Sequence, residues 1–212
     1  MLIALLLIAG CETTLAPETE QAQIGVVVNT VGSPAIIRHN QDYIIDLQSK
    51  IYEGDILQTN DASRAQLQMI DGSELSVGPG SHILFQSWTA AGRGERTVPR
   101  MTLNTGSIRV DSRGSREAAR STIELRTPLA IITARASDFW SGFLFGNSTL
   151  DINLISGDAV NVSNDHGSVS IALPGEGTTI LGGTGPQPAN TWTPRKQARA
   201  IEETIIRERS VP

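Results

Sequence analysis

Residues 51–85, IYEGDILQTNDASRAQLQMIDGSELSVGPGSHILF, decide the fold of this chain. The apolar residues Ala65, Leu67 and Met69 alternate with two glutamines, which is the period of a half-buried β-strand. A second alternating run, around Leu75 and Val77, follows a short polar interruption. The stretch therefore predicts short strands joined by tight turns.

The turns in this stretch have their own signals. Asp71-Gly72 lies between the two alternating runs and predicts a hairpin with a type I′ turn, because such a turn needs positive φ and glycine adopts it at low cost. Gly54-Asp55 opens an earlier strand, Ile56 to Thr59. Gly78-Pro79-Gly80 ends the last one, since proline has no N–H to donate to a ladder.

The same residues carry a resemblance to a known family. Their order and spacing resemble the FecR-type domain of bacterial periplasmic sensors. The matching positions are Gly54, Asp55, Ile56, Thr59, Ser63, Arg64, Ala65, Leu67, Asp71, Gly72, Ser73, Leu75, Pro79 and Ser81.

The resemblance continues to about residue 165. Its later motifs are Leu103–Val110, Thr127-Pro128-Leu129-Ala130 and Gly157-Asp158-Ala159-Val160. The family usually has Arg-Gly-Thr-x-Phe after the Thr-Pro segment, whereas this chain has Arg135-Ala136-Ser137-Asp138-Phe139. We therefore expect the bend at Ala136 to differ.

The expected fold is all-β, with many short strands in a β-sandwich or a β-solenoid-like FecR domain and a short C-terminal helix. Charged residues make up 18% of the chain and glycines number 20, a balance that favours strands and turns over long helices. Glycine followed by Asp or Ser before a strand recurs at Gly54, Gly106 and Gly157, which indicates an internal repeat of about 50 residues. Thr193-Pro194 predicts the start of the helix, and an apolar stripe of Ala198, Ala200, Ile201 and Ile205 follows.

The N-terminus indicates export. Residues 1–10 suit a lipoprotein signal peptide, and Ile8-Ala9-Gly10-Cys11 is typical of a bacterial lipobox, so Cys11 is the expected lipidation site. Glu12 follows this cysteine and favours the outer membrane. No Lys or Arg precedes Cys11, so we expect the natural start to lie upstream. The expected division is a tether over 11–22, a FecR-like all-β domain over 23–173, a Gly/Pro-rich linker over 174–191, and a helix and tail over 192–212.

Charge is unevenly distributed. Residues 93–135 hold nine arginines and four acids, a net charge of +5, while the whole chain carries −5. The loop around Trp88, Arg93, Arg96 and Arg100 is the candidate binding segment, because arginine favours bidentate contacts with phosphate or carboxylate. The alternative is a solvated or internally paired surface. The aromatic residues Phe139, Trp140, Phe143 and Phe145 are either a contact patch or core.

No chemistry-bearing motif stands out. The three histidines, His39, His82 and His166, are isolated, and no pair of ionisable residues has metal-ligand spacing. Asp55, Asp71 and Asp158 each neighbour a glycine, which favours a role in turns. We therefore expect no enzyme activity, catalytic residue, metal or cofactor, and no nucleic-acid partner for an acidic exported chain.

Two functions remain open. The first is a lipid-anchored periplasmic module that recognises a protein partner in envelope sensing or assembly. The second is a structural envelope lipoprotein that binds peptidoglycan or polysaccharide. Typical members of the resembled family are anti-sigma regulators with a cytoplasmic domain and a transmembrane helix before the periplasmic part, and we expect a stand-alone form here. A partner could add a strand at an exposed sheet edge or contact the arginine-rich loop.

Overall fold

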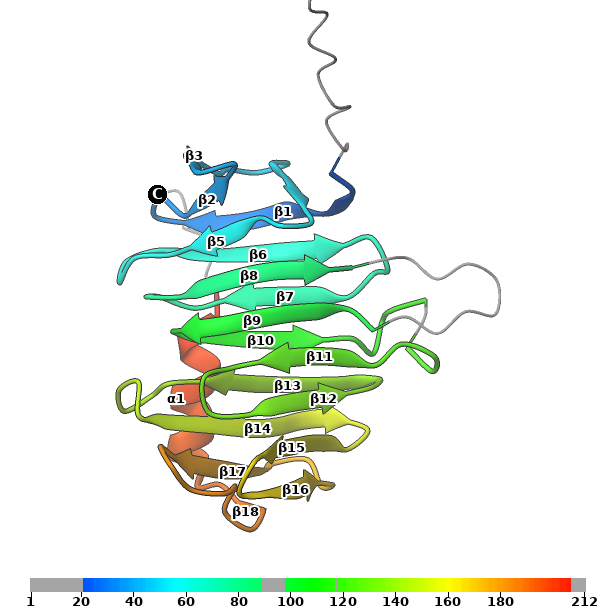
Figure 1. Ribbon diagram of the computed structural model, residues 1–212, viewed down its shortest axis with the longest axis vertical. Helices are drawn as coiled ribbons and strands as arrows, with labels where there is room; N and C mark the ends of the chain where they lie inside the picture. The colour runs from blue at the N-terminus through cyan, green and yellow to red at the C-terminus, as the bar shows by residue number, and fades with distance from the viewer. Residues whose placement is uncertain (1–20, 89–97, 117, 207–212) are drawn as a thin grey trace, which may run out of the picture.

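The computed structural model describes residues 21–88, 98–116 and 118–206, and these form two nine-stranded sheets that pack face to face, with one helix outside them (Figure 1). The all-β prediction with a short C-terminal helix is confirmed. Sheet A runs in the order β18 (Asn190–Thr191), β17 (Glu176–Leu181), β14 (Thr149–Gly157), β13 (Ser137–Gly142), β10 (Ser107–Asp111), β7 (Glu74–Val77), β6 (Arg64–Met69), β1 (Gln23–Val31) and β4 (Lys50–Tyr52).

Sheet B runs in the order β16 (Gly167–Ile171), β15 (Val160–Asn164), β12 (Ile131–Ala134), β11 (Ile123–Arg126), β9 (Arg100–Thr105), β8 (His82–Ser87), β5 (Ile56–Gln58), β2 (Ala35–Arg38) and β3 (Gln41–Ile44). All neighbouring strands are antiparallel except β9 and β11. In both sheets the chain advances from one end of the stack to the other, as the colours of Figure 1 show. The architecture is therefore a sandwich that grows along one axis, as a solenoid does.

The repeated glycines mark crossings between the sheets. Gly54 lies between β4 of sheet A and β5 of sheet B, Gly106 lies between β9 and β10, and Gly157 is the last residue of β14, before β15. Their φ angles are 86°, 82° and 95°, in the region that only glycine adopts without cost. The repeat seen in the sequence is therefore a repeated corner, where the chain leaves one sheet for the other.

Two hairpins differ in detail from expectation. β6 and β7 pair across Asp71-Gly72, but only Gly72 has positive φ. Gly72 N–H donates to the Met69 carbonyl at 2.9 Å, so the loop is a type I-like turn with a bulge. The type I′ pattern instead occurs between β2 and β3, where His39 and Asn40 have φ of 50° and 60°. The second strand of that hairpin is Gln41–Ile44.

The alternating residues of the sequence form the core between the sheets. Ala65, Leu67 and Met69 of β6 are buried, with exposed fractions of 2% or less. Burying one such large side chain stabilises the fold by about 1.5–3 kcal/mol. The core includes buried residues of both sheets, so neither sheet is stable as a single layer.

The segment 174–191 is not the linker that its glycines and prolines suggested. Glu176–Leu181 is β17, which pairs with β14 along five residues, and Asn190–Thr191 is β18. Gly177 is required there because a Cβ would lie 2.5 Å from the Trp192 ring nitrogen. The glycines therefore admit a close contact within sheet A and do not separate two units.

Helix α1 (Pro194–Thr204) lies along the stack against sheet A, with contacts to β10 and β13 (Figure 1). Thr193 is its N-cap and accepts from the Lys196 N–H, and Pro194 is its first residue, as predicted. Of the expected apolar stripe only Ala200 is buried, while Ala198 is exposed. Beneath the helix, Trp140 and Trp192 meet edge to face at 6.3 Å.

Candidate functional site

The family-like motif residues stabilise corners and turns. Asp55 is fully buried and receives two hydrogen bonds from the Arg38 guanidinium, at 2.7 and 2.6 Å, and one from the Tyr52 N–H at 2.8 Å. The hydrogen bond to Asp55 raises the pKa of Arg38. The Gly-Asp motif is thus a corner lock that joins β2, β4 and β5.

Three further motif residues have similar roles. Asp71 accepts hydrogen bonds from the Ser73 N–H and hydroxyl at 3.0 and 2.9 Å, and so closes the β6–β7 turn. The Thr59 hydroxyl donates to the Gly78 carbonyl at 2.7 Å. Arg64 donates from Nε to the Glu203 carbonyl at 2.9 Å, which holds the last turn of α1 on sheet A.

The Thr127-Pro128 motif also forms a turn. The Thr127 hydroxyl accepts from the Leu129 and Ala130 N–H groups at 3.2 and 3.0 Å, and the Thr127 N–H donates to the Ala130 carbonyl at 2.9 Å. These bonds reverse the chain between β11 and β12. The motif residues therefore specify the fold and do not converge on one pocket.

A four-residue charged network occupies the outer side of β10 and β13. Arg109 donates to both carboxylate oxygens of Asp138 at 2.8 Å, and Arg113 does the same to Asp111 at 2.9 and 2.6 Å. Arg113 also lies 3.3 Å from Asp138 and so joins the two pairs. Hydrogen bonds with Arg113 lower the pKa of Asp111, and the bond with Asp138 raises the pKa of Arg109. Much of the arginine-rich segment is therefore paired within the domain.

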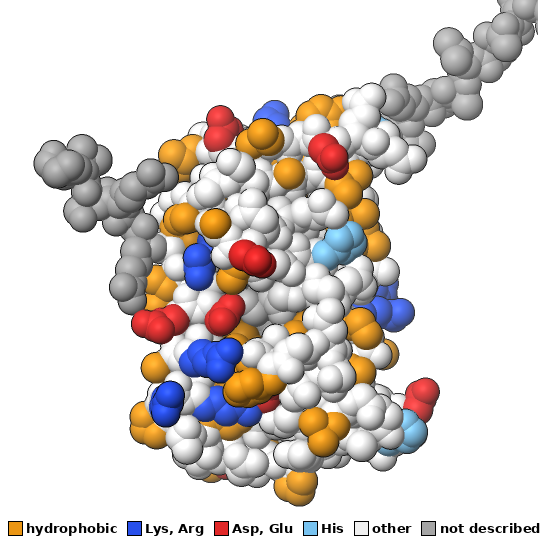
Figure 2. Space-filling view, turned by 90° about the vertical axis from the view of Figure 1, so that its left-hand side faces the viewer, with side chains coloured by type: hydrophobic (Ala, Val, Ile, Leu, Met, Phe, Trp, Pro, Cys, Tyr) orange, Lys and Arg blue, Asp and Glu red, His pale blue; other side chains and the backbone are white. Residues whose placement is uncertain are grey.

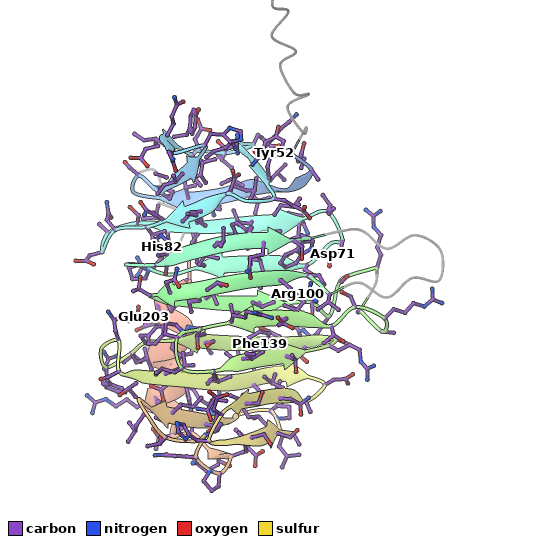
Figure 3. The ribbon with its side chains drawn as sticks, in the orientation of Figure 1. Tyr52, Asp71, His82, Arg100, Phe139 and Glu203 are labelled. Atoms are coloured by element: carbon purple, nitrogen blue, oxygen red, sulfur yellow. The ribbon has the colours of Figure 1, made fainter. Side chains whose placement is uncertain are left out.

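The predicted binding loop divides between buried, exposed and undescribed residues. Trp88 is 1% exposed and belongs to the core. Its backbone N–H donates to Glu53 Oε1 at 2.8 Å, so Trp88 is not a surface contact. Arg100 is half-exposed at the start of β9, with its Nε 3.6 Å from Glu124 (Figure 3). Arg93 and Arg96 lie outside the described residues, as does Cys11.

The aromatic cluster is largely structural. Phe139 and Trp140 are fully buried on opposite faces of β13, Phe139 in the main core and Trp140 beneath α1. Phe145 is 60% exposed, and the Arg199 guanidinium stacks 4.8 Å from its ring centre. Of the two alternatives left open by the sequence, core packing therefore holds for Phe139 and Trp140, and Phe145 is an exposed ring.

Known protein families include one whose pattern matches this chain. The family model described as "FecR protein" matches residues 55–169, more than half of the chain. The chain belongs to the FecR family. The match begins at the corner lock Asp55 and ends within β16, so it covers most of both sheets but neither the β1–β4 region nor α1.

Solved structures share the fold of this FecR-family chain. Two crystal structures, at 1.65 and 2.50 Å resolution, of a candidate anti-sigma factor from Parabacteroides distasonis each superpose with a TM-score of 0.55 and 12% identity. Each superposition covers 68% of this chain, and the chain spans 62% of the length of that protein. No curated protein matches the chain.

One surface of the FecR-family chain escaped sequence analysis. At the end of the stack where Tyr52 lies (Figure 3), three apolar side chains face solvent: Tyr43, Ile44 and Leu47, with exposed fractions of 43%, 78% and 62%. Sequence alternation identifies a strand but not its place at a sheet edge, which depends on pairing. This end lies outside the family match, which begins at Asp55.

Other site types find little support within the described ranges. Among residues 21–88, 98–116 and 118–206, no three His, Cys, Asp or Glu side chains gather in a way that could hold a metal ion. In the same ranges no helix has the length and apolar character needed to cross a bilayer. The face in Figure 2 instead presents mixed charge: basic side chains gather on its lower half and acidic ones lie above them.

Proposed function

We propose that this FecR-family chain is a lipid-anchored protein-recognition module of the bacterial cell envelope, facing the periplasm and serving envelope sensing or assembly. The observation that carries the proposal is the family match over residues 55–169. The match coincides with turns, corner locks and core strands, which build a rigid scaffold whose surface is free to bind.

The anchor depends on Cys11. We infer that it is acylated after cleavage and that several acyl chains hold the domain at the outer membrane. The test is fractionation of cells that express the wild-type chain or Cys11→Ala. The wild-type protein is expected in the membrane fraction and the variant in the soluble fraction. A variant that still fractionates with membranes would contradict the anchor.

Protein recognition is tested separately by crosslinking in intact envelopes, followed by affinity capture of the chain. Recovery of one or a few membrane proteins supports the proposal. Retention on purified cell-wall sacculi, with no protein captured, would replace it with a structural envelope role.

The arginine-rich loop is a separate candidate for the contact. A triple change of Arg93, Arg96 and Arg100 to Glu reverses its charge while leaving the paired arginines Arg109 and Arg113 intact. Loss of the captured partner would assign recognition to this loop, and an unchanged capture pattern would remove the loop from the proposal.

A further inference from the structure

The two ends of the β-stack are closed to different degrees. At the C-terminal end the 182–189 segment packs over the β15–β16 turn: Asn164 Nδ2 donates to the Thr184 carbonyl at 2.8 Å, and a Cβ at Gly185 would lie 2.9 Å from the His166 carbonyl oxygen. At the N-terminal end all four residues of β3 are exposed. A stacked β-fold needs a cap at each end, and here only one end has a covering segment among the described residues.

The register of β3 places hydrogen-bonding groups at its free edge. β2 and β3 are joined by the two-residue turn at His39-Asn40, and Ile36 is opposite Tyr43. In an antiparallel hairpin of this kind alternate residues exchange both backbone bonds with the partner, and the intervening residues direct theirs outward. Tyr43 therefore bonds to β2, whereas the N–H and C=O groups of Asp42 and Ile44 point to the open side.

The edge has only part of the usual protection against pairing, because it is short and carries one charge, Asp42. Its four residues, Gln41–Ile44, include no lysine and no proline, and the β2–β3 register is continuous without a bulge. Ile44 is 78% exposed. Beside the edge, a hollow of about 260 Å³ opens between β3 and β4 and is lined by Ile36, Ile45, Tyr43 and Tyr52 together with Arg38, Ile44, Ser49 and Lys50. An added strand could therefore pair with β3 and place one side chain in the hollow.

The charged side chains at and near β3 indicate which kind of strand can pair with its free edge. Arg38 is neutralised by Asp55, and the Asp46 carboxylate accepts from the Ser49 hydroxyl at 2.8 Å, whereas Asp42 lies on the edge strand itself and is exposed. In antiparallel pairing of two β3 strands centred on Tyr43, Asp42 would face an isoleucine and lose water without gaining a partner. A basic residue opposite Asp42 gains an ion pair instead, so the edge favours a foreign strand over a second copy.

We propose that the free edge of β3 is a β-augmentation site for an extended segment of the partner protein, with Lys or Arg opposite Asp42 and apolar side chains opposite Tyr43 and Ile44. This inference deepens the proposed recognition function and rests on it. The added strand would continue sheet B by one strand and fill the hollow.

The test uses the full chain and a short fluorescent peptide of Val-Val-Lys repeats, which can place lysine opposite Asp42 and valines opposite Tyr43 and Ile44, with a peptide of Val-Val-Glu repeats for comparison. Fluorescence anisotropy is expected to detect binding of the lysine peptide and at least about tenfold weaker binding of the glutamate peptide. Ile44→Pro removes one outward N–H without breaking a β2–β3 bond and is expected to weaken lysine-peptide binding at least about tenfold.

The matched control is Ser168→Pro on β16, the edge strand of sheet B at the other end, where Val162 is opposite Val169 and the Ser168 N–H by the same reasoning points outward. It is expected to bind the lysine peptide as the wild type does. Asp42→Lys changes only an exposed side chain. It is expected to bind the glutamate peptide more tightly than the lysine peptide, the reverse of the wild type. This variant therefore tests the inference even if a proline variant misfolds.

Three outcomes would overturn the inference: equal binding of both peptides, unchanged binding by Ile44→Pro, or a wild-type dimer in sedimentation that Ile44→Pro dissociates. The last outcome would assign the edge to a second copy. Capture from envelopes distinguishes failure of the β3 inference from failure of the proposed recognition function. If Asp42→Lys still captures the partner, the chain recognises a protein through a surface other than β3.

Discussion

Ala136 is the residue at which we expect a substitution to stabilise this domain. It lies at the corner before β13 with φ of 48°, a left-handed conformation, although the family pattern usually has glycine there. The Ala136 carbonyl still accepts from the Asp158 N–H at 3.3 Å, so the bend persists without the glycine. The alanine therefore holds a strained backbone angle in a corner that its neighbours maintain.

The size of the effect follows from two opposing terms. A non-glycine residue in the left-handed region costs about 1–2 kcal/mol, and glycine loses about 0.4–1 kcal/mol more conformational entropy on folding than alanine. Ala136→Gly should therefore raise the free energy of unfolding by about 0.5–1 kcal/mol, or the melting temperature by about 1–4 °C for a chain of this size.

The assay is urea unfolding of the full chain followed by fluorescence of its three tryptophans, all of which are buried. Two control variants test whether the change in stability comes from the left-handed backbone angle at residue 136. Ala134→Gly changes a buried strand residue with ordinary φ and should destabilise by about 1 kcal/mol or more. Gly157→Ala, at the same corner, would bring a Cβ onto the Ala136 carbonyl oxygen and should cost at least about 2 kcal/mol.

The reasoning would be refuted if Ala136→Gly lost as much stability as Ala134→Gly. In that case the corner would not hold residue 136 in the left-handed region. Equal stability of Gly157→Ala and the wild type would lead to the same conclusion, because the two residues meet across one corner.

Three other predictions concern charged groups. Asp55→Asn should destabilise the fold by about 3 kcal/mol in urea unfolding, since it leaves Arg38 without its buried carboxylate; a change below about 1 kcal/mol would contradict the corner lock. Because hydrogen bonds with Arg113 lower the pKa of Asp111 in the folded state, its contribution is fully present above its ordinary pKa near 3.8 and is lost as pH falls through the lowered folded-state pKa. Asp111→Asn should therefore cost about 0.5–1 kcal/mol at neutral pH and progressively less as the pH is lowered below 3.8, and a cost that does not change with pH would reject the Arg113 pairing. Lys196→Met removes the ammonium group that lies 2.6 Å from the fully buried Asp151 carboxylate beneath α1. The change should lower the free energy of unfolding by about 3 kcal/mol and shift tryptophan emission to longer wavelength. Unchanged emission would mean that the helix does not depend on the Lys196–Asp151 pair.

The motif residues predicted where the chain turns. Gly54, Asp55 and Asp71 were recognised as turn residues because glycine and aspartate have local conformational reasons to occur there. The alternation around Leu67 likewise indicated its buried face. In contrast, the sequence suggested a binding role for Trp88, and the structure places it in the core, because a tryptophan in a polar-looking segment gives no local sign of which way it points.

The candidate site was harder to foresee than the fold. The paired arginines 109 and 113 looked like a surface charge until sheet pairing brought Asp138 beside them. The sequence did not indicate the exposed edge at β3, since a strand's free side is defined only by which strand is missing next to it.

By itself, the sequence determined the class of this protein: alternating apolar residues and recurring turn glycines predict an all-β chain of many short strands. Those properties are local, because side-chain period and positive φ are set within a few residues. Only the tertiary structure decided which of the described residues are accessible, that 174–191 completes sheet A, and that no described segment covers the N-terminal end of the stack. These properties depend on strands that pair over long sequence separations, and no local pattern records which strand becomes the neighbour of which.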